Sequence, residues 1–337
     1  MNFVEMFSGI GGIGYGLVKA GWKCIGYAEL DKFAHRSYEI LHDPERRMWN
    51  RYNVRYVSNR SLRKLRRKRG KIRLLAAGFP CQSFSIAGKR KGFRDRTRGT
   101  LFFEIIRWAS ILEPEFLLLE NVEGLLNHDN GTTFEIIIGA LDELGYDAEW
   151  QVLNSSTYVP QNRERIFIVA SLRGASRGKI FPFGGESSNY VEVVGRIDVK
   201  GDDYIKRVYS PTGLSPCLPT MQGGGQVPKV IVEQSNVRCI NPRKPDGTQT
   251  YQQDRIYSVD GVMTALSAQL SGRFNIWDGK RVRNLTPLEC FRLQSYPDEW
   301  FYKLRNAGIS DSQLYKMAGN GVTSEVAYQI GKRLMAV

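Results

Sequence analysis

The chain has 337 residues, of which 42% are hydrophobic and 24% charged, and its 48 Lys and Arg exceed its 34 Asp and Glu by 14. These values predict a folded protein of one large or two moderate domains, and they argue against global disorder, a collagen-like repeat and a small disulfide scaffold. No apolar run approaches the roughly 18 residues of a membrane span, and the N-terminus lacks the cations of a secretion signal. The excess positive charge favours a polyanionic partner.

Short apolar segments alternate with helical patterns over the first 175 residues. Strands are predicted over residues 3–7, 24–28, 72–77, 116–119, 149–153 and 166–170, and helices over 13–20, 32–41, 101–112 and 133–144. Because strands separated by such helices form βαβ units, an α/β fold with a mainly parallel sheet is expected. Helical patterns return from Pro287 and end with a helix over 324–335.

The composition changes near Gly174. From there to about Trp277 the chain is rich in Gly, Ser and Pro and has short β-like segments but little helical periodicity. A weak repeat pairs the Arg-Val-Tyr-Ser segment from Arg207 with the Arg-Ile-Tyr-Ser segment from Arg255, 48 residues later. Two copies are too few for a solenoid, so they predict a smaller second domain of two related units.

The positive charge is concentrated in one stretch. Residues 46–73 contain 13 Lys and Arg and no acid, so the rest of the chain carries a net charge of only +1. A run of this kind is usually a solvated surface. A second basic cluster, with Lys89, Arg90, Lys91 and Arg98, lies in a glycine-containing segment and predicts a mobile loop.

Five cysteines, Cys24, Cys81, Cys217, Cys239 and Cys290, are widely spaced and form no CxxC pair. This spacing predicts a reducing, cytoplasmic location and no metal site. Cys81 differs from the others because it follows the third predicted strand in the polar turn Gly-Phe-Pro-Cys-Gln-Ser. An accessible thiol that nearby cations help to ionise and an ordinary buried cysteine are equally compatible with this pattern.

A glycine-rich turn follows the first predicted strand, in the order Phe7-Ser-Gly9-Ile-Gly11-Gly12. Glycines let a ligand approach the backbone at a helix N-terminus, and Glu29, at the end of the next strand, is well placed for ribose hydroxyls. A dinucleotide site and a tight structural turn both fit this pattern.

Two further polar motifs adjoin apolar strands. Glu120 ends the strand over 116–119, where partial burial would raise its pKa toward the range useful for proton donation. Arg163 and Arg165, two positions apart before the strand over 166–170, suit binding of carbonyl or phosphate oxygens. A capped strand end and a surface ion-pair cluster are the structural alternatives.

The motifs occur in the order FSGIGG, PCQ, ENV, QNRER, RNLTPLE and GNGV, and the last two lie near the C-terminus. Together and in this order, they resemble the motifs of the DNA cytosine-5 methyltransferases. The resemblance covers the whole chain and is closest to the prokaryotic and phage enzymes. It implies a Rossmann-like S-adenosylmethionine-dependent methyltransferase sheet in residues 1–175 plus 283–337, with a smaller, mostly β target-recognition domain in residues 176–282. A dinucleotide oxidoreductase becomes a remote alternative.

The resemblance also implies the site. The nucleophile would be Cys81, adding to cytosine C6, with Glu120 at N3 and Arg163 and Arg165 as the other catalytic residues, Arg165 holding O2. The family residues expected to bind S-adenosylmethionine are Phe7, Gly9, Gly11, Gly12, Glu29, Leu101 and Asn320. Residues expected to contact DNA are Gln82, Ser85, Lys89, Arg90, Lys91, Arg98, Gln222, Gly223 and Gly224. The target base must leave the duplex for these groups to reach it.

The expected partner is double-stranded DNA, bound by a monomer that needs no membrane and no metal. A cognate restriction enzyme, if one exists, would not be physically associated, and the location would be the nucleoid of a prokaryotic or phage-infected cell. The chain departs from the family near the third strand, where a basic run stands in place of the usual acid that holds the cofactor's adenine and Asn59 is the nearest polar residue. This motivates an alternative, a DNA-binding relative with weak or no methylation. We expect neutralising residues 66–69 to change solubility or non-specific DNA affinity more than turnover.

Overall fold

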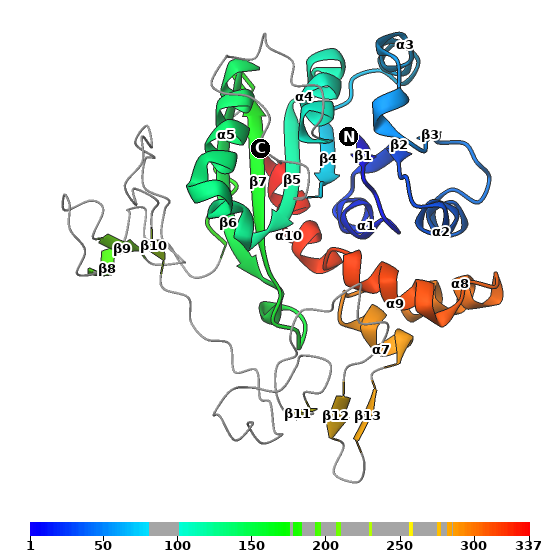
Figure 1. Ribbon diagram of the computed structural model, residues 1–337. Helices are drawn as coiled ribbons and strands as arrows, with labels where there is room; N and C mark the ends of the chain where they lie inside the picture. Colours follow the sequence, from blue (N-terminus) through cyan, green and yellow to red (C-terminus); the bar gives the residue numbers. More distant parts are fainter. Residues whose placement is uncertain are drawn as a thin grey trace.

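The computed structural model describes residues 1–80, 101–175, 178–183 and 286–337 in full, and six short strands between residues 193 and 284 by their backbone. A seven-stranded sheet forms the centre of the molecule, with helices on both of its faces (Figure 1). Its strands are β1 Asn2–Met6, β2 Lys23–Ala28, β3 Trp49–Arg51, β4 Leu74–Gly78, β5 Phe116–Val122, β6 Tyr146–Asn154 and β7 Glu164–Leu172.

The helices in the described part of the chain are α1 Gly12–Lys19, α2 Lys32–His42, α3 Asn59–Arg69, α4 Leu101–Leu112, α5 Thr132–Glu143, α7 Pro287–Arg292, α8 Asp298–Asn306, α9 Asp311–Asn320 and α10 Ser324–Ala336. The strand order is β3-β2-β1-β4-β5-β7-β6, and β7 alone runs antiparallel to its neighbours β5 and β6 within this sheet. The predicted α/β fold with a mainly parallel sheet is therefore confirmed.

Alternation along the strands builds a separate apolar layer on each face of the sheet. In β5, Leu117 and Leu119 pack with α3, α4 and α5, whereas Phe116 and Leu118 pack with α1 and α10. Successive side chains of a strand point to opposite faces, and a strand covered on both sides is consequently apolar throughout. Glu120, two residues after Leu118, falls on the α1 and α10 face.

The C-terminal helices form a third apolar cluster beside α2. Phe291, Trp300 and Leu314 are buried there together with Ala34 of α2. The helix α7 begins at a capping box in which Thr286 and Glu289 bond each other's backbone N–H groups. This cluster holds α7, α8 and α9 against α2 and against Tyr15 of α1.

The basic stretch contains structure that the sequence prediction did not include. The strand β3 and the helix α3 both lie within residues 46–73, and Leu62 and Leu65 of α3 are buried against the sheet side. The eleven residues of α3 are mostly cationic and include only two leucines, so the sequence by itself indicates a solvated surface. The outer face of α3 does match that interpretation.

Between residues 193 and 284, two three-stranded sheets are described. The first contains β8 Val193–Arg196, β9 Arg207–Tyr209 and β10 Lys229–Val230, and the second contains β11 Ile256–Ser258, β12 Asn275–Trp277 and β13 Val282–Asn284. The two copies of the predicted repeat form β9 and β11, one in each sheet. The division at residues 176 and 282 remains a prediction. Among the described helices, none has both the length and the apolar character of a membrane span.

Candidate active site

The motifs meet where the strand order reverses. From β1 the chain continues to β2 and β3 on one side, and it then returns to β4 and β5 on the other. In open α/β sheets, ligands bind outside the carboxyl ends of the strands at such a switch point. The turn after β1 and the residues after β4 lie at this edge, so the geometry predicts a site formed by them.

The turn after β1 has the backbone conformation that glycine favours. Gly9 and Gly11 have φ angles of +54° and +88°. A Cβ added to Gly11 would lie 2.5 Å from Nε2 of His42, and one added to Gly12 would lie 2.6 Å from the Tyr296 hydroxyl oxygen. Gly9 has nothing within 4 Å of such a Cβ among the described residues. Packing therefore explains Gly11 and Gly12, whereas the described residues leave space beside Gly9.

Glu29 joins the ends of β1 and β2. Its Oε2 accepts a hydrogen bond from the Gly9 N–H at 2.7 Å, and its Oε1 accepts one from the Asp31 N–H at 2.7 Å. Burial raises the pKa of Glu29, and the two backbone donors oppose that shift. The carboxylate is held rigidly at the edge of the site, with acceptor capacity left for a ligand's hydroxyl groups.

Glu5 anchors the same turn from inside the core. Its Oε1 accepts a hydrogen bond from the Gly14 N–H at 3.0 Å, and the Tyr38 hydroxyl donates to its Oε2 at 3.1 Å. Complete burial raises the pKa of Glu5 to about 8, so this carboxyl group is mostly protonated at neutral pH. The buried acid holds the start of α1 in register with β1.

We expect Glu5→Gln to remove a pH dependence of stability. The folded protein binds the Glu5 proton up to about pH 8, whereas an unfolded chain loses it near pH 4.5, so the stabilisation is complete at low pH and disappears as pH rises. Each pH unit in this window corresponds to about 1.4 kcal/mol. Between pH 6 and pH 8, urea unfolding should show the wild type losing stability relative to Glu5→Gln. The control variant Glu143→Gln, which changes an exposed acid, should lose as much stability as the wild type over this range. A pH-independent difference would contradict this.

The end of β5 is tied to the end of β4. In the sheet register Glu120 is paired with Gly78, three residues before Cys81. The buried Asn121 donates from Nδ2 to the Phe79 carbonyl oxygen at 2.8 Å. The ENV motif therefore fixes the backbone that leads directly into Cys81, in addition to supplying Glu120.

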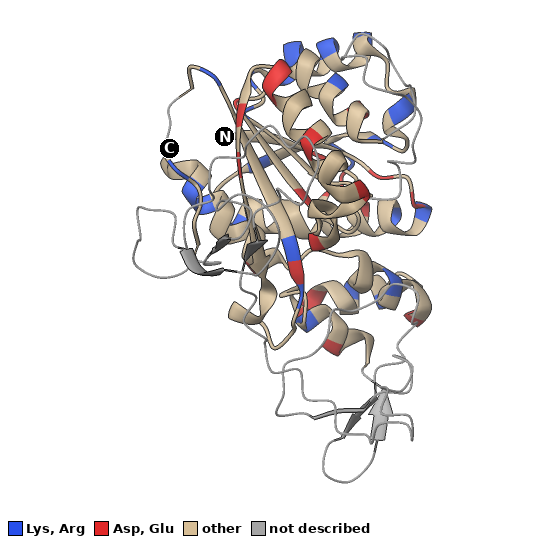
Figure 2. Ribbon diagram, turned by 60° about the vertical axis from the view of Figure 1, so that its left-hand side comes forward, with Lys and Arg blue, Asp and Glu red and all other residues tan. Residues whose placement is uncertain are grey.

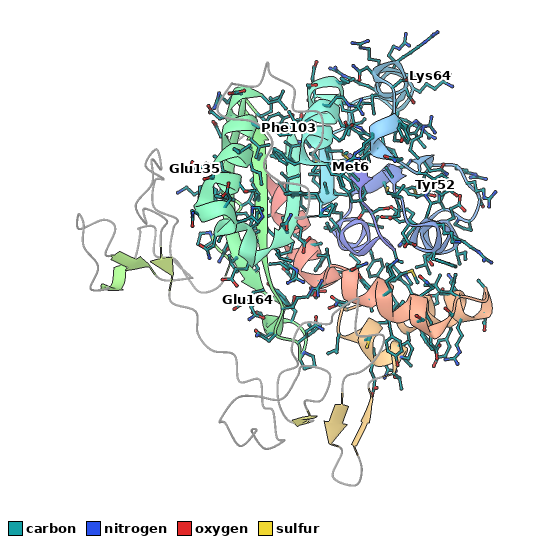
Figure 3. All side chains as sticks on the ribbon, in the orientation of Figure 1. Met6, Tyr52, Lys64, Phe103, Glu135 and Glu164 are labelled. Atoms are coloured by element: carbon teal, nitrogen blue, oxygen red, sulfur yellow. The ribbon has the colours of Figure 1, made fainter. Side chains whose placement is uncertain are left out.

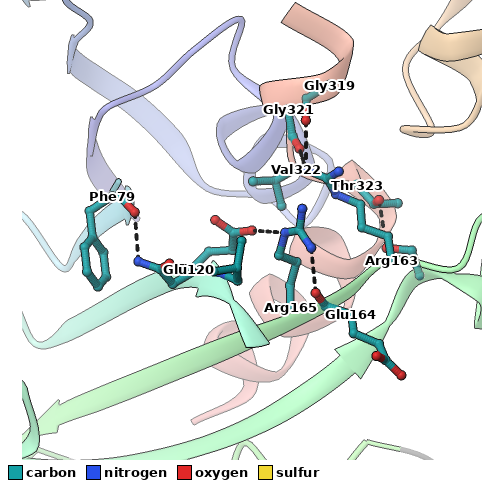
Figure 4. A network of polar contacts seen from close by, with 12 residues as sticks. Phe79, Glu120, Arg163, Glu164, Arg165, Gly319, Gly321, Val322 and Thr323 are labelled. Carbon is teal, nitrogen blue, oxygen red and sulfur yellow. Dashed lines mark hydrogen bonds and ion pairs between the residues drawn. The ribbon is translucent and has the colours of Figure 1, made fainter. Parts of the chain in front are cut away.

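Glu120 and Arg165 form the central ion pair of the site (Figure 4). The Glu120 Oε1 lies 3.3 Å from the Arg165 Nε, and both side chains are largely buried. Burial raises the pKa of Glu120, and Arg165 followed by Arg163 opposes that shift. A carboxyl group with a raised pKa beside a fixed cation can hold a proton and deliver it to a ligand nitrogen.

Arg163 has a different environment from Arg165. Its guanidinium donates to the carbonyl oxygens of Gly319 at 3.2 Å and Gly321 at 2.5 Å, the residues on either side of Asn320 (Figure 4). Only 3% of its surface is exposed, and burial lowers its pKa to about 10, which still leaves it charged at neutral pH. Arg163 thus positions the GNGV segment, whereas Arg165 faces Glu120.

A chain of buried polar side chains connects the same segments. The Gln294 amide donates to Gln161 Oε1 and to the Ala318 carbonyl oxygen, and Gln294 Oε1 accepts from the Thr323 hydroxyl. The Ser155 hydroxyl in turn donates to Thr323 Oγ1 at 2.8 Å. These bonds join the QNRER turn, the turn after α7 and the GNGV segment into one unit.

The model of the C-5 cytosine-specific DNA methylases matches this chain over residues 1–336. The chain belongs to that family. An orphan methyltransferase of Bacillus phage SPbeta, M.SPBetaI, is 30% identical, over 99% of this chain and 97% of its own. The type II methyltransferase M.HhaI of Haemophilus parahaemolyticus is 31% identical, over 99% of this chain and 95% of its own.

Two solved structures are similar to this methylase in fold. The S. pombe Dnmt2 methyltransferase has a TM-score of 0.63 at 17% identity, covering 100% of this chain and 98% of its own. A putative DNA modification methyltransferase encoded within an E. coli prophage has a TM-score of 0.62 at 18% identity, covering 100% and 99%. The methylase therefore has the Rossmann-like fold of S-adenosylmethionine-dependent methyltransferases, as predicted.

Arg163→Lys should weaken cofactor binding in the methylase as well as stability. Lysine keeps the charge but lacks the planar fork that serves both carbonyls around Asn320, so we expect a loss of about 2–3 kcal/mol in the free energy of unfolding. Cofactor affinity, measured by calorimetry, should fall about tenfold. Arg333→Lys is the matched control, because Arg333 donates to the Ile180 and Pro182 carbonyls at 2.5 Å. An equal loss of cofactor affinity in both variants would contradict the role of Arg163.

The other predicted cofactor residues of the methylase lie around the same edge. Phe7 and Leu101 are half-buried and pack on one apolar cluster, and Asn320 is exposed at the end of α9. Asn59 is engaged elsewhere, because its Oδ1 accepts from Arg107 at 2.8 Å. Within the described residues, no group of three or more His, Cys, Asp or Glu could hold a metal ion.

Several predicted residues fall outside the described part of the methylase. These are the nucleophile candidate Cys81 and the DNA-contact candidates Gln82, Ser85, Lys89, Arg90, Lys91, Arg98, Gln222, Gly223 and Gly224. Conversely, the sequence prediction did not include Asn121, Gln161 or Gln294 as site residues. Asn121 and Gln161 stand inside the ENV and QNRER motifs, and Gln294 follows the RNLTPLE motif by five residues.

Proposed function

We propose that this methylase transfers a methyl group from S-adenosylmethionine to C5 of a cytosine in duplex DNA, through a transient bond between Cys81 and cytosine C6. The observation that supports this most directly is the buried Glu120–Arg165 pair, in register with the strand end that leads to Cys81. Within the family, the enzyme would accordingly be a DNA (cytosine-5-)-methyltransferase. The cofactor, the attacking residue and the recognition domain are parts of this proposal.

The residues at the end of β1 and β2 fit the proposed cofactor. The Ser8 hydroxyl is buried and has no hydrogen-bond partner among the described residues, and none of those residues lies within 4 Å of a Cβ built on Gly9. Glu29 would hold the ribose hydroxyls, Phe7 and Leu101 would offer apolar surface, and Asn320 would complete the pocket. When bound, S-adenosylmethionine supplies an electrophilic methyl group on its sulfonium sulfur.

The chain's own residues would prepare the cytosine. The C5 atom of cytosine is too weak a nucleophile to attack the methyl group by itself. The Cys81 thiolate therefore first adds to C6 of the base and forms a C–S bond. Glu120 donates its proton to N3 as the ring electrons shift, which makes C5 enamine-like, and Arg165 holds O2 and orients the ring. After C5 is methylated, loss of its proton to a base and departure of Cys81 restore the aromatic ring.

None of these atoms can be reached inside a stacked duplex. The target nucleotide must rotate out, at a cost of a few kcal/mol, and contacts in the pocket and along the backbone offset that cost. We assign those contacts to the basic loop after Cys81 and to residues 176–282 as the target-recognition domain. The protein would act as a monomer on DNA in the nucleoid, without a bound restriction enzyme.

The alternative is a DNA-binding relative with little or no methylation. It rests on the absence of the family's adenine-binding acid near the strand predicted over residues 72–77. Asn59 does not take its place, because its side chain is bonded to Arg107. Intact Glu120, Arg165 and PCQ count against this alternative. No measurable cofactor binding at millimolar concentration would favour it.

Bisulfite sequencing of DNA from cells that express the chain tests the proposal and identifies the site. We expect protected cytosines confined to one short sequence, and none in cells that express Cys81→Ala. Transfer of labelled methyl groups to duplex DNA by the purified protein provides the second measurement. Absence of 5-methylcytosine in both experiments, despite cofactor binding, would overturn the proposal.

A further inference from the structure

The outer face of α3 carries four cations in a single row. Arg60, Arg63, Lys64 and Arg67 are all exposed, and their spacing of three, four and seven residues places them on one side of a helix. The buried Leu62 and Leu65 lie on the opposite side. Figure 2 shows Lys and Arg gathered on the helices at the top of the view, and Figure 3 shows Lys64 at the outer edge of the molecule.

These four differ from other cations of the basic stretch, several of which are neutralised or bonded. Arg66 pairs with Glu113 at 2.6 Å, Lys71 and Arg73 both pair with Glu115, and Arg69 donates to the Arg47 carbonyl oxygen. In the described part of the chain, none of the four has an ion pair or a hydrogen bond. The basic stretch therefore contains two groups of cations, one bonded within the protein and one, the four residues of the row, exposed to solvent.

The helix that carries the row is fixed at both ends. The Ser58 hydroxyl caps it by accepting from the Ser61 N–H, and Arg107 of α4 donates to Asn59 Oδ1. Near its other end, Arg66 donates to the Ile111 carbonyl oxygen at 3.2 Å. The row therefore presents four cations over about 10 Å on a rigid support.

We propose that this row, Arg60, Arg63, Lys64 and Arg67, is a second, sequence-independent contact for duplex DNA, separate from the cleft that reads the target. A rigid line of exposed cations complements the regular phosphates of a duplex, which carry about one charge per 1.7 Å of axis. α3 begins beside the middle of α4, where Arg107 bonds Asn59, and runs toward the start of β5, where Arg66 pairs with Glu113. The row therefore extends away from the carboxyl edge of the sheet, where the proposed catalytic residues lie. This contact would hold the methylase on long DNA between target sites.

The test uses the full chain with Arg60→Gln, Arg63→Gln, Lys64→Gln and Arg67→Gln combined. Glutamine keeps helix propensity and removes only the charge. Binding to a duplex of alternating dA and dT, which offers no cytosine, is followed by fluorescence anisotropy between about 50 and 200 mM salt. We expect at least about tenfold weaker binding at the low-salt end, and a salt slope smaller by about 3 to 4, since each phosphate contact contributes about 0.9.

A charge-matched variant, with Lys19, Lys23, Lys179 and Lys332 replaced by glutamine, separates a specific surface from net charge. These lysines are exposed and lie on or beside α1, β2, residues 178–183 and α10. The control should keep the wild-type slope. An unchanged slope in the α3 variant, or an equal decrease in both variants, overturns the proposal.

Methyl transfer to a short duplex is a second measurement, which separates failure of this proposal from failure of the proposed function. The α3 variant should retain the wild-type kcat on a short duplex that contains one target site, while its KM on long DNA rises. Loss of kcat on the short duplex would place the row in the catalytic machinery and contradict the inference. Absence of methyl transfer by the wild type would instead contradict the proposed function and leave the salt-slope result interpretable.

Discussion

Replacing Cys81 with alanine is expected to reduce methyl transfer by about 10⁴-fold or more, to the background of the assay. Without a thiolate at cytosine C6 the ring keeps its aromatic electrons, and C5 does not become nucleophilic. When catalytic residues act together in one mechanism, removal of the nucleophile abolishes almost all of the rate enhancement. Cofactor binding and DNA binding should persist, because Glu29 and the rest of the cofactor edge are unchanged.

Cys290→Ala serves as the matched control. Cys290 is buried, and burial raises the pKa of its thiol to about 12, so it carries almost no thiolate at neutral pH. The control should retain the wild-type kcat despite some loss of stability from the deleted sulfur atom. If Cys81→Ala kept more than a trace of activity, the covalent mechanism would be wrong.

Replacing Glu120 with glutamine should lower kcat by about 10²- to 10⁴-fold and change the KM for DNA little. The amide has the shape of the carboxyl group and can still donate a hydrogen bond to N3, but it cannot transfer a proton. Because the variant also removes the Arg165 ion pair, thermal unfolding and cofactor binding should be measured beside the rate. A variant that folds, binds both substrates and keeps full kcat would contradict the role of Glu120.

The pH dependence of the same variant provides an independent test. Burial raises the pKa of Glu120, and in the proposed mechanism this group acts only while it holds its proton. The wild-type rate should therefore fall as rising pH removes the proton from Glu120. Glu120→Gln should lack the fall at high pH, whereas Glu143→Gln, on an exposed acid, should retain it.

Much of the sheet was predictable from the sequence because its strands are covered on both faces. Continuous apolar runs such as Phe116-Leu-Leu-Leu119 have few other interpretations once polar turns bound them. The structure extends this strand to Val122 and places Glu120 within it. The pairing of Glu120 with Arg165 follows from the antiparallel register of β5 and β7, which local sequence does not specify.

The parts that could not be predicted depend on long-range contacts or on mixed local signals. The bond between Ser155 and Thr323 joins residues 168 positions apart, and the position of Arg163 depends on the Gly319 and Gly321 carbonyls. The three-residue β3 is too short for a periodic pattern. In α3 the charge of the surface concealed two buried leucines, although their spacing of three is helical.

The separation of two arginine roles is the main functional refinement from the structure. Both arginines of QNRER were predicted to be catalytic, and both influence Glu120 electrostatically. The hydrogen bonds differ, because Arg163 serves the backbone around Asn320 and Arg165 faces the carboxyl group. Variants of Arg163 should consequently act first on cofactor affinity, and variants of Arg165 on the cytosine.

The most direct test of the covalent mechanism uses duplex DNA synthesised with 5-fluorocytosine in place of cytosine. Fluorine at C5 cannot leave as a proton does, so methylation should trap the protein on DNA through Cys81. In the presence of S-adenosylmethionine we expect an adduct that survives denaturing electrophoresis and whose modified peptide contains Cys81. An adduct at another residue, or no adduct from a preparation that methylates ordinary DNA, would contradict the mechanism.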